Sequence, residues 1–274
     1  MIGEWLLDYG YALPTVEPNL KLWPVIAVVV LLVMINVAAN KAVPGYYLFW
    51  ALGGSVVVLA LGVLDGCTWA DLGLAPRTWP RGLIWGGIAV LLVFAVYAVG
   101  TTWKRTRQAF HDQNIAGLSL PRLFWQSMVE LPFGTVLFEE VAFRGVLWAM
   151  LARRYGVVWA TVWSSLLFGL WHILPSLDLH LRNERLGQVG GGGHRARITA
   201  IVGSVVATGI GGVVFCLLRI GSGSLFAPMG LHHLVVMDTA VAQEVARTLP
   251  RGEFWTEHML YWAMGRRGAA RVPR

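Results

Sequence analysis

Ionisable side chains stand at positions where a lipid bilayer would surround them. The run FEEVAFRG places Glu139, Glu140 and Arg144 inside an apolar segment, and His172 and His232 follow in two later apolar segments. A carboxylate beside an imidazole in a partly dry pocket can act as a general base on a bound water. A further imidazole across the pocket can donate to the oxyanion of a tetrahedral intermediate. These residue types therefore predict hydrolysis by activated water.

Helix geometry separates the roles of the two glutamates. Glu140 and Arg144 are four residues apart, so they share one helix face and can pair, whereas Glu139 is turned about 100° away. A buried ion pair that only fixes helix packing would explain Glu140 and Arg144 but not Glu139. A lone histidine near a helix end is more often a packing residue than a catalyst. Three polar helices, however, are expected to bring their charges together in one wet cavity.

The pattern favours water over a covalent nucleophile. There is no GxSxG motif, and we expect Cys67 and Cys216 to be free thiols without a metal or disulfide partner. One glutamate and two histidines could also bind zinc. However, HExxH is absent and no pair of these ligands shares a helix face at the i, i+4 spacing. We therefore expect no cofactor, with zinc as the alternative.

The composition is that of an integral membrane protein. Of the 274 residues, 56% are hydrophobic and 14% are charged, about half the charged fraction of a typical globular protein. The mean hydropathy is +0.60. These values exclude a disordered chain, a coiled coil and a disulfide scaffold. The net charge of +7 is attributed to basic cytoplasmic loops rather than to nucleic-acid binding.

Several apolar runs approach the length of about 20 residues that crosses a bilayer. They predict an all-α, polytopic membrane bundle, formed by residues 1–274 as one domain. The ionisable residues within the runs predict a polar intramembrane cavity. We expect seven spans, within a range of six to eight. The fourth is interrupted by Pro132, and residues 254–264 form an amphipathic interfacial helix. The predicted spans are 23–39, 46–64, 82–100, 123–151, 157–174, 198–218 and 224 to about 245.

Loop charges predict the orientation. Of the 22 Lys and Arg residues, fifteen lie in one set of alternate segments and six in the other, so the N-terminus is expected outside and the C-terminus in the cytoplasm. The acidic start lacks the basic region of a cleavable signal. The glycines at 190–193 predict a flexible linker rather than a phosphate loop. In the sixth span Gly203, Ala207 and Gly211 form a stripe suited to close helix packing.

Three motifs in order resemble the CPBP family of intramembrane glutamic endopeptidases, which includes CAAX prenyl endopeptidases and bacterial Abi relatives linked to bacteriocin processing or immunity. The family's EExxxR stands here as Glu139 to Arg144, and its FxxxH as Phe168 to His172. Its GSLxxPxxxH stands as Gly223 to His232. Each motif is weak alone. Together they cover residues 119–245, which we expect to be the catalytic core.

The resemblance implies a helical membrane fold whose polar cavity opens to the cytoplasm. It implies that Glu139 with His172 activates water, that Glu140 and Arg144 orient this pair, and that His232 stabilises the oxyanion. The expected partners are the lipid bilayer and a membrane-associated or prenylated-type peptide, with no nucleic acid. The expected location is the plasma membrane of a bacterium.

One position departs from the family pattern. Val236 stands where the family usually has an asparagine, and Val236 cannot donate a hydrogen bond. Asp238 lies about 200° further round the helix, while His233 is adjacent. Loss of an oxyanion donor costs about 10² to 10³ in rate. A non-catalytic membrane adaptor or immunity-type protein is therefore the alternative. A proton-coupled transporter is disfavoured because inverted repeats are lacking.

Overall fold

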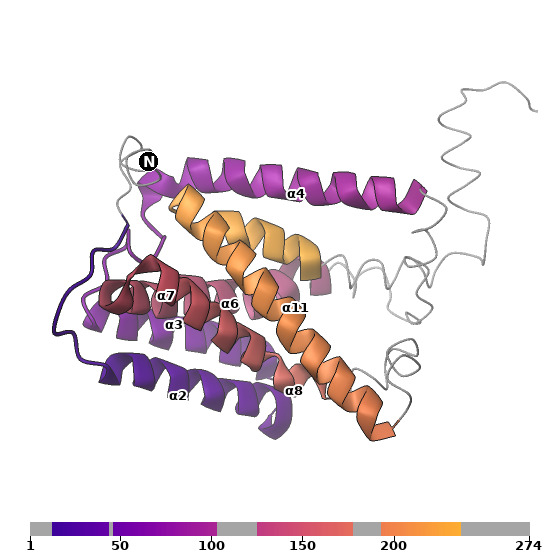
Figure 1. Ribbon diagram of the computed structural model, residues 1–274, viewed down its shortest axis with the longest axis horizontal. Helices are drawn as coiled ribbons and strands as arrows, with labels where there is room; N and C mark the ends of the chain where they lie inside the picture. The colour runs from indigo at the N-terminus through magenta and orange to yellow at the C-terminus, as the bar shows by residue number, and fades with distance from the viewer. Residues whose placement is uncertain (1–12, 44–45, 103–124, 178–192, 237–274) are drawn as a thin grey trace, which may run out of the picture.

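The computed structural model describes residues 13–43, 46–102, 125–177 and 193–236, which form helices and no strand (Figure 1). The all-α prediction is confirmed. In the first half, the helices follow the predicted spans within a few residues. They are α2 (Trp23–Val37) with its π-helical extension η1 (Ala38–Ala42), α3 (Tyr47–Leu64), the 3-10 turn η3 (Pro76–Thr78) and α4 (Trp79–Thr102).

The second half carries the polar residues. It contains two π-helical stretches and one long crossing helix, followed by an apolar helix over Phe226–Val236 that Figure 1 draws without a label. The other elements are η5 (Gln126–Val136), α6 (Leu137–Glu139), η6 (Glu140–Leu147), α7 (Trp148–Trp171), α8 (Ile173–Ser176) and α11 (Gly193–Ser222).

Four helices of the described chain are long and apolar enough to cross a membrane, which supports a multi-pass membrane protein. The predicted count of seven is not confirmed. The predicted third span corresponds to α4, which is not among the four. The predicted fourth and fifth spans fall in a single run of 49 residues, and the predicted seventh is described only as a short helix. The interfacial helix predicted at 254–264 lies outside the described residues. The four long helices are Trp23–Ala42, Tyr47–Leu64, Met128–Ser176 and Gly193–Ser222.

The run of 49 residues is a helical hairpin that reverses at Gly156. This glycine has φ 80° and ψ 168°, a region of backbone space that is essentially restricted to glycine. Hydrogen bonds between the two arms show that they run antiparallel. Trp148 bonds to Thr161, Ser164 bonds to the carbonyl of Phe143, and Trp171 reaches Glu139. The hairpin thus brings the end of α7 back to the glutamates.

Pro132 was predicted to interrupt the helix, but the helix continues through it. Pro132 lies inside the π-helical stretch η5, which continues into α6. A proline lacks the N–H that an α-helix would need at this position. π-helical turns are rare, but they occur inside helices and frequently lie at functional sites. The chain therefore reaches Glu139 as an uninterrupted helix.

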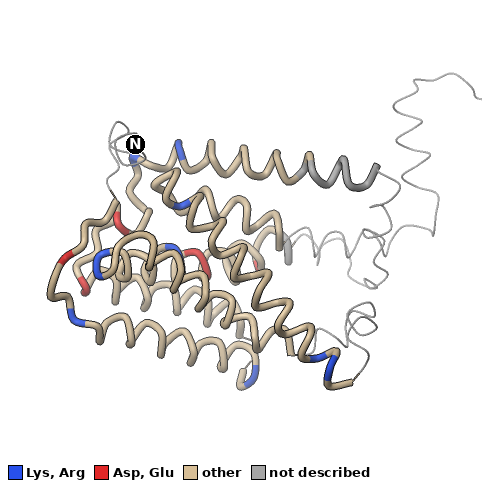
Figure 2. The backbone as a smooth tube through the Cα atoms, viewed as in Figure 1, with Lys and Arg blue, Asp and Glu red and all other residues tan. Residues whose placement is uncertain are grey.

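Ion pairs and hydrogen bonds connect the tip of the hairpin to neighbouring segments. Arg154 donates to both carboxylate oxygens of Asp65, at 2.8 and 2.6 Å, and also to the carbonyl of Lys21. Arg153 donates to Glu17 at 2.8 Å and holds the pKa of that carboxyl below its usual value. Figure 2 shows the described charges concentrated towards helix ends, with long uncharged stretches between them. The network joins three segments at one end of the bundle.

Helix α11 crosses α7 at small residues, but not at the predicted ones (Figure 1). A Cβ on Gly169 would lie 2.7 Å from the carbonyl oxygen of Val205, and one on Gly212 would lie 3.0 Å from Ser165. Gly203 and Gly211 instead have no described atom within 4 Å of such a Cβ. The predicted stripe is therefore not the packing face between these helices. α11 also begins at Gly193, five residues before the predicted span.

Candidate active site

Four of the five predicted site residues form one buried cluster. Arg144 Nη1 donates to Glu140 Oε1 at 3.2 Å, as the spacing predicts, and His232 Nδ1 lies 2.8 Å from the same oxygen. Glu140 and Arg144 are fully buried, and His232 is 4% exposed. Because a carboxylate oxygen only accepts, His232 Nδ1 carries the hydrogen. In the neutral ring Nε2 therefore keeps its lone pair.

Aromatic rings hold the cation of this cluster. The Arg144 guanidinium carbon lies 3.8 Å from the ring centre of Phe168 and 4.9 Å from that of Phe215. The His232 ring stacks on Phe215 with centroids 4.8 Å apart. A cation over an aromatic face is attracted to it, and most strongly where water is excluded. Phe168 and Phe215 thus fix Arg144 and His232 relative to each other.

The two carboxylate oxygens of Glu139 have different surroundings. Oε1 accepts a hydrogen bond from the indole N–H of Trp171 at 3.0 Å. Oε2 is buried and has no hydrogen-bond partner among the described residues, and it lies 3.7 Å from His232 Nε2. This distance is too long for a hydrogen bond, and a neutral His232 would present two acceptors facing each other. A water molecule that donates to both would suit this pair.

His172 lies beside the cluster rather than in contact with Glu139. Its Nδ1 lies 2.8 Å from the carbonyl oxygen of Phe168, so Nδ1 carries the hydrogen and Nε2 is the acceptor in the neutral ring. The His172 ring meets that of Phe168 edge-on at 4.7 Å, and the same Phe168 ring meets His232 at 6.0 Å. No hydrogen bond between Glu139 and His172 occurs in the described structure. The imidazole next to Glu139 is His232.

A tight turn after α11 positions the short helix that carries His232. α11 ends at Ser222, and Gly223 follows with φ 71°, a left-handed conformation that favours glycine. Ser222 Oγ accepts the Ser224 N–H at 3.1 Å, and the Leu225 N–H donates to the carbonyl of Gly73. These bonds fix the start of the helix Phe226–Val236, one and a half turns before His232. His233, on the same helix, has no partner for its Nδ1 among described residues.

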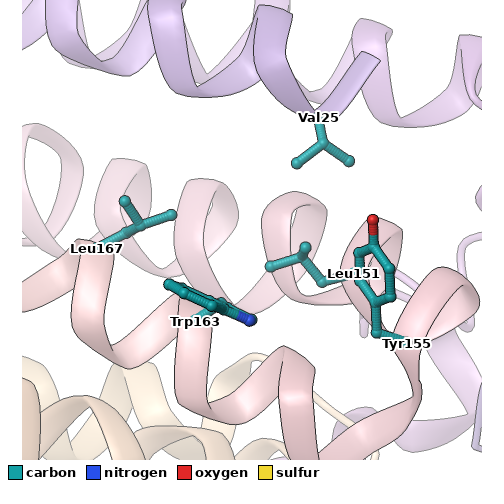
Figure 3. A pocket seen from close by; sticks show the side chains of 5 residues that line it. All are labelled: Val25, Leu151, Tyr155, Trp163 and Leu167. Atoms are coloured by element: carbon teal, nitrogen blue, oxygen red, sulfur yellow. The ribbon is translucent and has the colours of Figure 1, made fainter. Parts of the chain in front are cut away.

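An apolar cavity of about 370 Å³ lies elsewhere, between α2 and α7 (Figure 3). A second cavity of about 10 Å³ lies between α2, α3 and η5 and includes Trp171 in its wall. Neither cavity is lined by any of the five predicted site residues, which pack directly between helices. The larger cavity offers no carboxylate or imidazole for hydrolysis. It is lined by Val25, Leu151, Tyr155, Trp163 and Leu167.

Sequence reasoning did not find the neighbours that orient the cluster. Trp171 contacts Glu139, Phe215 stacks on His232, and Asn36 donates to the carbonyl of Trp171 at 2.9 Å. A buried asparagine inside the first span is a signal that could have found one of them, because polar groups at membrane depth need partners. Cys67 and Cys216 are both buried free thiols. No set of three or more metal-binding side chains occurs within the described part of the chain.

Comparison with known proteins agrees with the geometry. Residues 121–237 match a family model described as type II CAAX prenyl endopeptidase Rce1-like. No curated protein and no solved structure matches the chain. The matched segment contains both glutamates, Arg144, His172 and His232, and it confirms the resemblance drawn from the three motifs. The segment from residue 121 to 237, which builds the buried cluster, is thus similar to the Rce1-like family of type II CAAX prenyl endopeptidases.

Proposed function

We propose that this protein is an intramembrane endopeptidase that hydrolyses a peptide bond of a membrane-associated or prenylated-type peptide by glutamate-activated water, with residues 119–245 as its catalytic core. One observation carries the proposal. Glu139 has one oxygen held by Trp171 and the other buried, without a hydrogen-bond partner in the described chain, and 3.7 Å from His232 Nε2. A base in this arrangement is oriented but not blocked.

In this proposal Glu139 Oε2 accepts a proton from a water molecule, whose oxygen attacks the peptide carbonyl carbon. Glu140 orients His232 through the hydrogen bond at 2.8 Å. Arg144 pairs with Glu140 and lies over Phe215, the ring on which His232 stacks. If His232 Nε2 takes up a proton from bulk solvent before the reaction, it can donate that hydrogen to the oxyanion and keeps it throughout. Collapse of the tetrahedral intermediate breaks the C–N bond, and the proton held by Glu139 passes to the leaving amine. His172 Nε2 is a second imidazole acceptor beside the cluster.

The test is cleavage of a membrane-anchored peptide by purified protein in proteoliposomes. Glu139→Gln removes the base and keeps the shape, so its rate is expected to fall by about 10² to 10⁴. Glu17→Gln is the matched control, because Glu17 is half exposed at the hairpin tip, and it is expected to retain the wild-type rate. Equal rates for wild type and Glu139→Gln would show that Glu139 is not the base.

A second candidate function rests on Val236. A non-catalytic membrane adaptor or immunity-type protein would keep the buried cluster as a scaffold and would not need an oxyanion donor at this position. In a cellular complementation assay, Glu139→Ala and His172→Ala would then retain function while expressing at wild-type levels. Loss of function in either well-expressed variant excludes the adaptor.

A further inference from the structure

Trp171 is in contact with the proposed base and occupies an unspecified position of the FxxxH motif. It is the last residue of α7, directly before His172, and its side chain turns back into the hairpin. The indole Nε1–H donates to Glu139 Oε1 at 3.0 Å. Trp171 is 8% exposed, so this bond is shielded from solvent. An indole only donates, and therefore it favours the ionised carboxylate and cannot take the proton itself.

The position of the indole is fixed from three sides. Its ring packs at 5.7 Å against Phe138, the residue before Glu139, and at 5.7 Å edge-on against Phe143. The backbone carbonyl of Trp171 accepts a hydrogen bond from the Asn36 side chain on α2, and Asn36 Oδ1 in turn accepts from Asn40 at 2.7 Å. A donor held this firmly can set the rotamer of its acceptor. Glu139 Oε2 is thereby directed at His232.

We propose that Trp171 is a positioning residue for Glu139: its indole N–H holds one carboxylate oxygen so that the other faces His232 and stays available to water. The inference rests on the proposed function. The hydrogen bond can also be tested by a measurement that needs no peptidase activity. A failure of this inference can therefore be distinguished from a failure of the proposed function. Because Oε1 is held by the indole, the carboxylate presents only Oε2 to the reacting water, and this orientation is set before the reaction begins.

The kinetic test uses Trp171→Phe, which keeps an aromatic ring and removes the N–H. We expect kcat to fall about 10- to 100-fold, the effect of a lost hydrogen bond to a charged group, while KM stays near the wild-type value. We also expect the acidic limb of the pH–rate profile to move to higher pH, because the anionic carboxylate has lost a donor. Trp159→Phe is the matched control, since Trp159 is an exposed indole on the same helical arm.

A double variant distinguishes positioning from packing. In a Glu139→Gln background, Trp171→Phe should cause no further loss, since the two residues act as a unit. An unchanged kcat and pH limb in Trp171→Phe would overturn the inference and leave the proposed function standing. A rate that falls equally at every pH, together with a raised KM and a lower melting temperature, would show that the indole contributes to packing and does not position Glu139.

The test without activity is the NMR spectrum of the ¹⁵N-labelled tryptophan indoles in detergent micelles. The chain has 14 Trp, and Glu139→Gln should shift the Nε1–H signal of Trp171, because its acceptor becomes neutral, while the Trp159 signal stays in place. If Trp171→Phe does not fold, Asn36→Ala replaces it in the kinetic test with an expected loss of several-fold. An unmoved Trp171 signal overturns the inference whether or not the protein cleaves peptides.

Discussion

At the residue scale, the site combines contacts that spacing predicts with contacts that only the fold creates. The pairing of Glu140 with Arg144 follows from helix periodicity, and the structure shows it at 3.2 Å. The role of Trp171 was not predictable, because a tryptophan in an apolar span usually faces lipid or packs. His172 and His232 were both predicted, but only the three-dimensional structure places His232 rather than His172 next to Glu139.

Arg144 is expected to be essential for stability as well as for orientation. It is fully buried, pairs with Glu140 and lies over Phe168. Removing one partner of a buried pair leaves the other charge uncompensated and costs about 3–5 kcal/mol. We therefore expect Arg144→Leu to lower the free energy of unfolding by this amount, measured by denaturant titration in micelles. Arg195→Leu, an exposed arginine at the start of α11, should change it by less than about 0.5 kcal/mol. Comparable losses in the two variants would contradict a buried pair.

At the element scale, the sequence predicted where helices run better than how they connect and cross. The segments 46–64 and 82–100 match the bounds of α3 and α4 within three residues, and α3 is also long and apolar enough to cross a membrane. Pro132 was expected to interrupt a helix that in fact continues through a π-helical stretch. The small-residue stripe at Gly203 and Gly211 was expected to pack, but periodicity does not say which face of α11 meets α7.

Gly156 is the position on which the hairpin most depends. Its φ of 80° and ψ of 168° are strained for any residue with a Cβ, even though the nearest described atom would lie 3.8 Å away. We expect Gly156→Ala to destabilise the protein by about 1–3 kcal/mol, measured as a lower melting temperature. The expected peptidase activity should fall with it, because the hairpin brings Trp171 to Glu139.

Gly53→Ala provides the matched control for this backbone effect. Gly53 lies inside α3, and a Cβ added there would have no described atom within 4 Å, so alanine should stabilise the helix by about 0.5–1 kcal/mol. Opposite signs for the two glycine substitutions are expected. A neutral or stabilising Gly156→Ala would mean that the chain does not reverse through this conformation.

At the scale of the whole molecule, the structure shows what the basic residues of the less basic set of loops contact. Five arginines belong to this set, and three of them make the following contacts within the fold. Arg153 and Arg154 bind Glu17 and Asp65. Arg219 is fully buried and donates to the carbonyls of Ala70 and Asp71. The charges of these three arginines are therefore engaged in contacts within the protein.

The charge asymmetry of the loops leads to an expected orientation that cysteine labelling can test. Val16 and Lys41 are both exposed and flank α2. With the N-terminus outside, a membrane-impermeant maleimide added to intact cells should label Val16→Cys, and it should label Lys41→Cys only after the membrane is opened. The native thiols should give little background. Cys67 and Cys216 are buried, and burial raises the pKa of the Cys67 thiol, so little of it is the reactive thiolate. The reverse labelling pattern would place the basic loops outside, contrary to the charge asymmetry.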